Sequence, residues 1–135
     1  MDVLPLFRQW FRARNKKRSR DPNEVRAERY LRRRGLKTVV RNYTRRCGEI
    51  DLIMLDGPVL VFVEVRFRGR TAFTTGAESV DRNKQRRIAR TARMFLGNHP
   101  QYSHRPTRFD VVSISKTNYR FTQCWIADAF IDSAE

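Results

Sequence analysis

The segment Gly48-Glu49-Ile50-Asp51-Leu52-Ile53-Met54-Leu55 is followed, after Asp56-Gly57-Pro58, by Val59-Leu60-Val61-Phe62-Val63-Glu64-Val65-Arg66-Phe67. Both apolar runs have the length of a strand, and the Gly-Pro pair between them is a strong turn signal. We therefore expect strands over 49–55 and 59–67 that pair as an antiparallel hairpin. Residues 59–65 are apolar on both faces except at Glu64, which is typical of a central strand covered on both sides.

The segments around this hairpin predict the fold class. Asp21 is suited to cap a helix and Pro22 to its first position, so we expect a helix over 21–34 that Gly35 ends. Apolar periodicity predicts a second helix, and alternation predicts further strands. These elements are expected over 80–96 for the helix and over 36–43, 108–115 and 121–126 for the strands. The order α-β-β-β-α-β-β predicts a mixed β-sheet core flanked by helices.

The charge balance limits the class of partner. The chain has 135 residues, with 29 Lys and Arg against 14 Asp and Glu, a formal net charge of +15. A body this basic repels itself unless it meets a polyanion, for which nucleic acid is the first candidate and an anionic membrane surface the second. The sequence has no apolar run of about 18 residues that could span a membrane. Two cysteines without CxxC spacing favour a reducing, cytoplasmic setting.

Residues 1–20 differ in composition from the rest of the chain. They contain one acid, Asp2, and seven basic residues: Arg8, Arg12, Arg14, Lys16, Lys17, Arg18 and Arg20. We expect a flexible basic arm, followed over 21–135 by a single nucleic-acid-binding domain. Apolar residues at helical spacing (Leu4, Phe7, Trp10 and Phe11) leave open an amphipathic helix that binds phosphate or a membrane.

Two carboxylates fall on one face of the predicted hairpin. Closing the turn over Gly57-Pro58 places Asp51 opposite Glu64 and Glu49 opposite Arg66, where directly opposed Cβ atoms lie about 4.5–5.5 Å apart. Two buried carboxylates repel each other and are costly to desolvate, and a divalent cation relieves both effects. Asp51 and Glu64 are therefore candidate ligands of Mg²⁺ or Mn²⁺. The alternative is a structural salt bridge of this pair to Arg66 or Arg68.

The first predicted helix offers further acids. Glu24 and Glu28 both lie within its inner arc, and either could reach the carboxylate pair. The alternatives are helix capping for Glu24 and a surface ion pair with Arg32 for Glu28.

The second predicted helix has an apolar and a basic stripe. The first contains Lys84, Ile88, Ala92 and Phe95, and the second contains Arg82, Arg86, Arg90 and Arg93. We expect the apolar stripe to pack on the sheet and the arginines to face a phosphate backbone, or else solvent. Lys84 could lean toward the carboxylates. The loop 68–78, with Arg68, Arg70, Thr74 and Thr75, could close over a substrate.

The remaining polar and aromatic candidates carry weaker signals. His99 and His104 have no nearby cysteine or acid, so we expect both on the surface. Tyr102 and Trp125 are expected to pack rather than to stack on bases.

Several segments together resemble a known family. Glu24-x-x-Ala27-x-x-Tyr30-Leu31-x-x-x-Gly35, then Asn42, Gly48-Glu49-Ile50-Asp51-Leu52-Ile53, Phe62-Val63-Glu64-Val65-Arg66 and Arg108-Phe109-Asp110-Val111-Val112 resemble the YraN family of bacterial proteins. That family has an endonuclease-like fold similar to archaeal Holliday junction resolvases and PD-(D/E)XK nucleases. The resemblance covers roughly residues 22–131 and implies a restriction-endonuclease-like core.

The resemblance also implies catalytic roles. Glu24 matches the acid of the first helix, Asp51 the metal-binding aspartate, and Glu64 with position 66 the E-x-K pair. This chain departs from the motif because Arg66 replaces the lysine, and an arginine cannot act as a base although it can hold a phosphate oxygen. Asn23 also stands where a small residue is usual. Lys84 could substitute for the missing lysine.

Two functions follow from these expectations. The first is a metal-dependent endonuclease that hydrolyses phosphodiester bonds in DNA, branched DNA included. The alternative is a catalytically inactive nuclease fold that binds nucleic acid. A homodimer would suit a two-fold symmetric junction, but the sequence shows no dimer interface.

Overall fold

The predicted order of helices and strands is confirmed by the computed structural model, which describes residues 20–68 and 80–132. Its elements are α2 (Pro22–Arg33), β1 (Lys37–Arg45), β2 (Gly48–Asp56), β3 (Val59–Phe67), α3 (Arg82–Asn98), the short 3₁₀ helix η2 (Pro100–Tyr102), β4 (Thr107–Thr117) and β5 (Arg120–Phe130). Residues 1–19 of the predicted arm (1–20) and residues 69–78 of the predicted loop (68–78) lie outside the described residues. Neither described helix has the length and hydropathy to cross a membrane.

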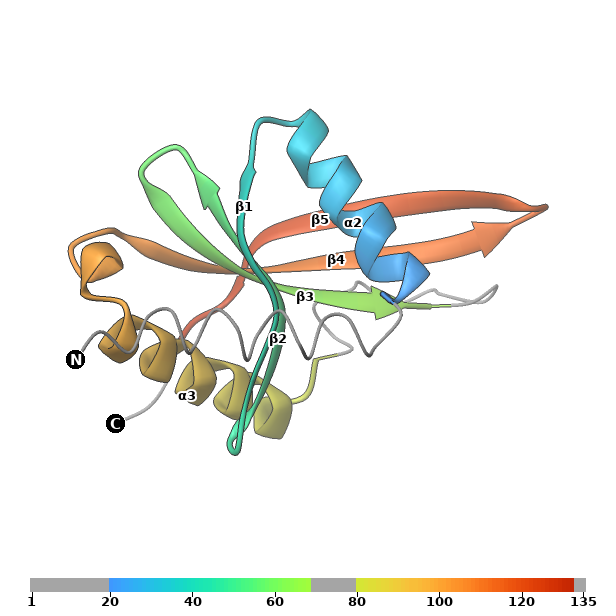
Figure 1. Cartoon of the computed structure of the whole chain (residues 1–135). Coiled ribbons are helices and arrows are strands. Elements are labelled where there is room, and N and C mark those ends of the chain that lie inside the picture. The colour runs from blue at the N-terminus through green and yellow to red at the C-terminus, as the bar shows by residue number, and fades with distance from the viewer. Residues whose placement is uncertain (1–19, 69–79, 133–135) are drawn as a thin grey trace.

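The strands form one mixed sheet in the order β1-β2-β3-β4-β5 (Figure 1). β3 and β4 are parallel, and the other neighbours are antiparallel. The chain between β3 and β4 contains α3, because parallel neighbours need a long crossover connection. β3 is the middle strand, as its apolar faces predict.

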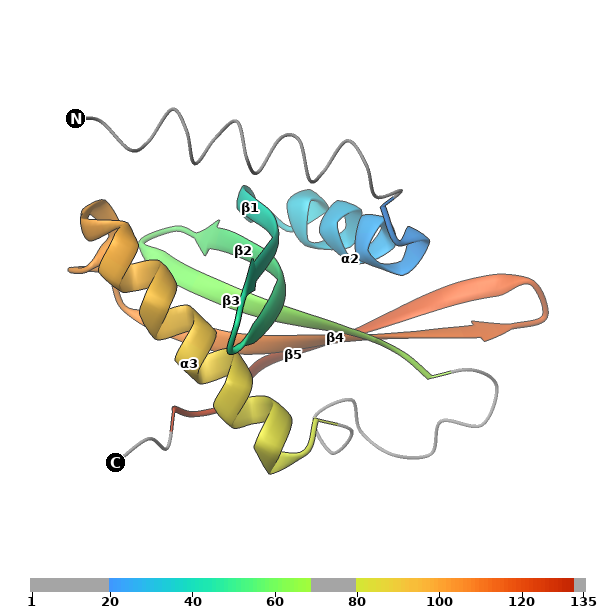
Figure 2. The same cartoon turned by 60° about the horizontal axis from the view of Figure 1, so that its bottom comes forward.

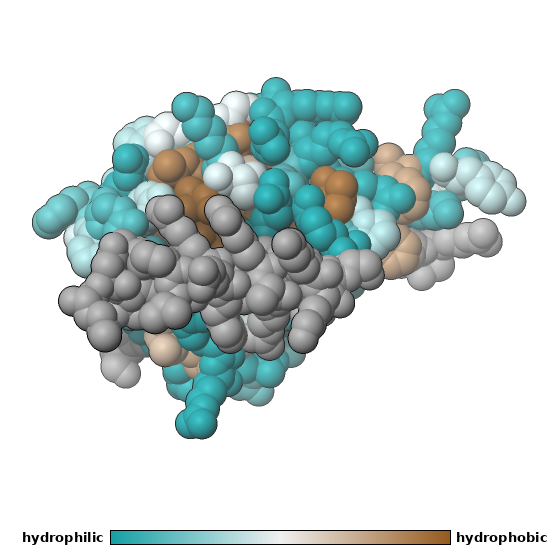
Figure 3. All heavy atoms as spheres, in the orientation of Figure 1, coloured by the Kyte–Doolittle hydropathy of each residue, from teal (hydrophilic) through white to brown (hydrophobic). Residues whose placement is uncertain are grey.

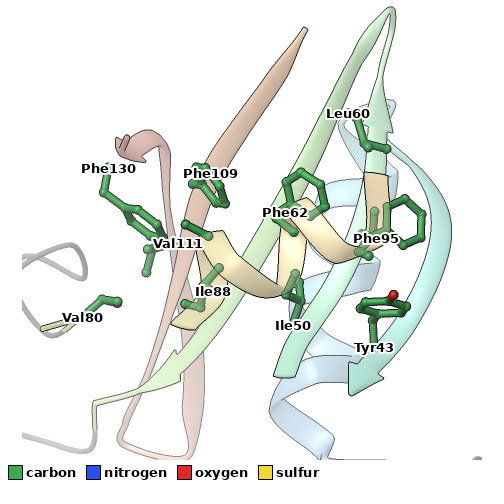
Figure 4. Close-up of a cluster of buried hydrophobic side chains, with 13 residues drawn as sticks. Tyr43, Ile50, Leu60, Phe62, Val80, Ile88, Phe95, Phe109, Val111 and Phe130 are labelled. Carbon is green, nitrogen blue, oxygen red and sulfur yellow. The ribbon is translucent and has the colours of Figure 1, made fainter. Parts of the chain in front are cut away.

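The two helices cover opposite faces of this sheet (Figure 2). On the α3 face, Leu60 and Phe62 pack with Phe95 in a buried cluster (Figure 4). On the α2 face, Val61 and Val63 belong to a second cluster that includes Leu31 of α2. Alternate residues of β3 thus fill two separate cores, which explains why this strand is apolar on both sides.

Gly48 allows β2 to begin directly against α3. A Cβ atom at this position would lie 3.1 Å from Thr91 Oγ1 and 3.4 Å from the Arg87 carbonyl oxygen. Both partners belong to the middle of α3, so a larger residue would push the helix away from the sheet.

Asp110, on β4, is a fully buried acid with a complete set of partners. Its carboxylate accepts two hydrogen bonds from Arg108, at 2.8 and 3.0 Å, one from Trp125 Nε1 at 2.8 Å and one from the Asp128 backbone N–H at 2.9 Å. Arg108 also donates to Asp56 on β2. These bonds tie β2, β4 and β5 together on the α2 side of the sheet.

We expect Asp110→Ala to lower the free energy of unfolding by about 3 kcal/mol, because it removes the acceptor of the Trp125 indole, of one backbone N–H and of two of the three Arg108 hydrogen bonds. Urea denaturation followed by circular dichroism measures this change. Asp56→Ala is the control: it removes only the exposed end of the network and should cost less than about 1 kcal/mol. Equal losses for both variants would contradict the assignment.

The expectation that His99 lies on the surface is wrong. His99 is only 8% exposed, its ring stacks on Phe95 with centroids 4.1 Å apart, and its Nδ1 lies 2.8 Å from the Phe95 carbonyl oxygen. The chain turns back after α3 and brings η2 against the helix end, which buries the ring. His104 is exposed as expected. Tyr102 packs near Phe95 and Trp125 against the second cluster, which confirms their packing roles.

Candidate metal and nucleic-acid site

The candidate site lies where β2 and β3 separate. Their ladder runs from Asp56↔Val59 to Leu52↔Val63, in the predicted register, and ends there. On the N-terminal side of Leu52, β2 continues to pair with β1, as in Tyr43↔Ile50. Beyond Val63, β3 continues to pair with β4, as in Glu64↔Val111. The sheet therefore forks, and the fork begins at Asp51 and Glu64.

Asp51 occupies the fork. Its Oδ2 accepts a hydrogen bond of 2.8 Å from the Val65 backbone N–H, which takes the place of the next ladder bond. The predicted direct pairing of 51 with 64 and 49 with 66 is therefore wrong in detail, because the ladder stops one pair earlier. The two carboxylates nevertheless remain neighbours. Burial, and then the negative charge of Glu64, raise the pKa of Asp51 well above its usual value.

Glu24 reaches the same fork from α2. Its carboxyl group has side-chain hydrogen bonds with Asn42 and Asp51, and its pKa is raised by burial and by the charges of Asp21 and Glu49. Helix capping is provided instead by Asp21, whose Oδ1 accepts the Asn23 backbone N–H at 2.8 Å. The first turn of α2 therefore places Glu24 beside the carboxylate pair.

Asn42, part of the family motif, also belongs to the site, a role that the sequence alone does not predict. It lies on β1 with φ of 51° and hydrogen-bonds Glu24. Few residues other than glycine adopt this left-handed conformation, and asparagine is among the most tolerant. An isolated asparagine inside a strand pattern was the available signal. Glu49, on the opposing segment of β2, also lies close enough to Glu24 to affect its pKa.

Two cations approach Glu64. Lys84 Nζ lies 2.5 Å from Glu64 Oε1, and Arg66 Nη1 lies 3.9 Å from the same oxygen. The expectation that Lys84 leans toward the acids is confirmed. The Asp81 side chain caps α3 by accepting the Lys84 backbone N–H at 2.8 Å, so this lysine lies in the first turn of the helix, beside the fork.

Neither role considered for Glu28, reaching the carboxylate pair or forming a surface ion pair with Arg32, is the one that the structure shows. Glu28 is 4% exposed and accepts hydrogen bonds from Thr38 Oγ1 at 2.6 Å, Arg41 Nε at 2.7 Å and Arg20 Nη2 at 2.8 Å. Burial acts to raise the pKa of Glu28, but these donors together outweigh burial and lower it. Glu28 thus anchors β1 and Arg20 to α2, away from the fork.

The arginines of the predicted basic stripe, Arg82, Arg86, Arg90 and Arg93, are all exposed along α3, as is Arg87. Arg93 forms an ion pair with Asp132, which reduces its free charge. Arg68 is half-buried, and its backbone N–H extends the β3–β4 pairing by bonding the Ile114 carbonyl. Arg70 and the loop threonines lie outside the described residues.

A second group of arginines lies on the other face of the sheet. Arg20, Arg29, Arg32, Arg33 and Arg41 line a pocket of about 430 Å³ between α2 and β1, together with Glu28. Hydrophilic side chains dominate this part of the surface (Figure 3). The molecule is therefore basic on both sides of the fork.

The fork suits a hard divalent cation better than a soft one. Within residues 20–68 and 80–132, no three His, Cys, Asp or Glu side chains are grouped so as to hold a metal ion. Mg²⁺, however, is commonly held by one or two carboxylates, with water and phosphate oxygens completing its octahedron. The Asp51–Glu64 pair fits that donor set, and the raised pKa of Asp51 shows that burial and the Glu64 charge disfavour its ionised form, which a bound cation would stabilise.

A mixed sheet with one helix on each face and carboxylates at its fork is consistent with a nuclease-like fold. Residues 23–114 match the uncharacterised protein family UPF0102. The chain is 43% identical over 128 residues to a UPF0102 protein of Alcanivorax borkumensis, covering 94% of this chain and 98% of that protein. It is 48% identical over 107 residues to one of Xanthomonas euvesicatoria pv. vesicatoria, covering 79% and 86%. The chain belongs to the UPF0102 family, which confirms the YraN resemblance.

Proposed function

We propose that this protein is a divalent-metal-dependent endonuclease that hydrolyses phosphodiester bonds in DNA. The observation that carries the proposal is the fork between β2 and β3, where Asp51 and Glu64 meet beside Lys84. Buried like charges destabilise a fold, so their retention between two cores favours a functional role over a structural one.

The residues of the fork divide the work. Asp51 and Glu64 would hold Mg²⁺ or Mn²⁺, which supplies a Lewis acid and lowers the pKa of a bound water. The Val65 N–H fixes the orientation of Asp51, and Glu24 hydrogen-bonds Asp51 from the α2 side. These contacts preorganise the carboxylates before a substrate arrives.

Lys84 and Arg66 take separate roles in this proposal. Lys84 is the group that orients the attacking water or accepts its proton, because a lysine can titrate and an arginine cannot. Arg66, whose Nη1 lies 3.9 Å from Glu64 Oε1, holds a nonbridging phosphate oxygen with the N–H groups of its planar guanidinium. The lysine of the family motif would thus have moved from β3 to α3.

Nucleic acid would bind along α3. Arg82, Arg86 and Arg90 are exposed on the helix whose first turn carries Lys84. A phosphate backbone bound by these arginines would therefore extend to the fork. Such contacts recognise phosphates and carry no base information. Binding should therefore be largely independent of sequence and weaken steeply as salt rises.

We expect the double variant Arg86→Ala/Arg90→Ala to reduce the slope of log Kd against log salt by up to about two units, because each phosphate contact contributes about 0.9. Fluorescence anisotropy with a labelled duplex between 50 and 200 mM salt measures the slope.

The control is Arg29→Ala/Arg33→Ala, which removes the same charge from exposed positions on α2, on the other face of the sheet. It should change the slope much less. If both pairs change it equally, net charge rather than the α3 surface determines binding.

A second function is favoured by one observation: Arg66 stands at the motif lysine. This second function is nucleic-acid binding without cleavage. The discriminating experiment is a cleavage assay on branched, duplex and single-stranded DNA with Mg²⁺ or Mn²⁺. Metal-dependent products support the enzyme, whereas binding without products supports the alternative. Sedimentation of the same samples tests a homodimer.

A further inference from the structure

The β4–β5 hairpin extends beyond the rest of the described sheet (Figure 1). Pairing of β3 with β4 reaches Phe67↔Ile114, whereas β4 and β5 continue to pair to Thr117↔Arg120. The hairpin therefore ends in a two-stranded projection with an exposed turn.

The turn at this end carries an unusual residue. Asn118 and Tyr119 have φ of 49° and 63°, so both central positions are left-handed, as in a type I′ turn. Asparagine suits the first position, but glycine is strongly favoured at the second, where a tyrosine is strained. Tyr119 is also 91% exposed, so burial of its ring does not offset that strain.

Contacts within the hairpin do little to offset the strain at Tyr119. Lys116 Nζ lies 5.9 Å from the Tyr119 ring centroid, at the outer limit of a cation–π contact. Tyr119 is thus strained and almost wholly exposed, and strain of this kind is typical of functional positions.

We propose that the end of the β4–β5 hairpin is a second nucleic-acid contact, in which Tyr119 stacks on an unpaired base while Lys116 and Arg120 face the adjacent phosphates. This inference rests on the proposed nucleic-acid partner and specifies what part of the substrate is recognised. Every base has an aromatic face, so such stacking tolerates any sequence but needs a base outside the duplex stack. Both exposed cations flank Tyr119 in the chain.

The length of the hairpin sets the distance between the turn and the carboxylates of the fork. Val111 pairs with Glu64, and Thr117 lies six residues further along β4, about 20 Å at the usual strand rise. At about 3.4 Å per nucleotide of a duplex strand, the turn would meet the substrate roughly six nucleotides from the carboxylates.

The hairpin also contacts the helix that supplies Glu24 to the fork. The Arg26 guanidinium lies 3.5 Å from the ring centroid of Phe121 on β5, and Arg26 belongs to the same helix as Glu24. Lys116 Nζ lies 5.1 Å from the centroid of the same Phe121 ring. The part of β5 next to the turn thus contacts the helix that carries Glu24.

The test is Tyr119→Gly in the full chain, with Tyr119→Phe as the matched control. Binding is measured to a blunt duplex and to the same duplex with a single-stranded tail that carries 2-aminopurine. We expect Tyr119→Gly to weaken binding of the tailed DNA about tenfold, to leave the blunt duplex unchanged, and to reduce quenching of the 2-aminopurine. Tyr119→Phe should behave as wild type. The melting temperature of Tyr119→Gly should rise, because glycine relieves the turn.

Four results would overturn the inference. Unchanged binding of both DNAs by Tyr119→Gly would show that the ring makes no contact, and equal losses on both would show that unpaired bases are not recognised. A lower sedimentation coefficient for Tyr119→Gly than for wild type would assign the turn to self-association. Failure of the wild type to bind any nucleic acid would overturn the proposed function as well, which separates that outcome from the others.

Discussion

Asp51→Asn is expected to abolish Mg²⁺-dependent DNA cleavage while raising the stability of the protein at neutral pH. Loss of one metal ligand removes several kcal/mol of charge stabilisation, so cleavage should fall on the order of 10³-fold or more. The pKa of Asp51 is raised in the folded protein, so the native state binds its proton more tightly than the unfolded chain does. Wild-type stability should therefore fall as the pH rises from about 4, the unfolded value, to the higher folded value. Asparagine has no carboxyl proton to release, so the Asp51→Asn variant should not lose stability in this way.

Thermal unfolding from pH 4 to pH 8, with and without Mg²⁺, measures both effects. Mg²⁺ should raise the melting temperature of the wild type and not of Asp51→Asn, and DNA binding should be unchanged or tighter because a negative charge near the phosphate is removed. Asp56→Asn, on the same strand but outside the fork, should retain the Mg²⁺ effect. If Asp51→Asn instead unfolds the protein, the carboxylate pair is a structural salt-bridge element.

Lys84→Ala should reduce cleavage by about 10²–10⁴-fold, the usual contribution of a group that transfers a proton or orients the attacking water. Arg66→Ala should reduce it less, and Arg66→Lys should keep or raise activity because it restores the family motif. Single-turnover cleavage with saturating protein separates these effects from DNA affinity.

The control for Lys84 is Lys84→Arg, which preserves the ion pair with Glu64 but cannot titrate. Activity of Lys84→Arg near the wild-type level would assign Lys84 to charge alone. If wild type and Arg66→Lys are both inert on every DNA while metal is bound, the enzyme proposal is wrong and the binding function remains.

Much of the fork could be predicted because it depends on local periodicity. The turn at Gly57-Pro58 fixes the register of five consecutive pairs between β2 and β3, and alternation then brings Asp51 near Glu64. Lys84 was predictable for the same reason, since helical spacing aligns it with Ile88 and Ala92 on the buried side of α3.

The remainder depends on contacts between elements that are distant in the sequence. Where the β2–β3 ladder ends is decided by competition from β1 and β4, which no periodicity reports. The partners of Glu28 could not be predicted, because two of them, Thr38 and Arg41, lie on β1 up to 13 residues away, outside the helix-spacing rule. His99 was misassigned because the return of η2, rather than its own neighbours in sequence, buries it.

The parallel pairing of β3 with β4 has a kinetic consequence. Two-residue connections join β1 to β2 and β2 to β3, so this meander closes with little loss of chain entropy, whereas β4 must wait for the long crossover from Phe67 to Thr107. We therefore expect Asp51 and Glu64 to come together early in folding, before α3 docks and brings Lys84. Repulsion between the two carboxylates would then raise the folding barrier. We infer that Mg²⁺ or mild acid accelerates folding as well as stabilising the native state.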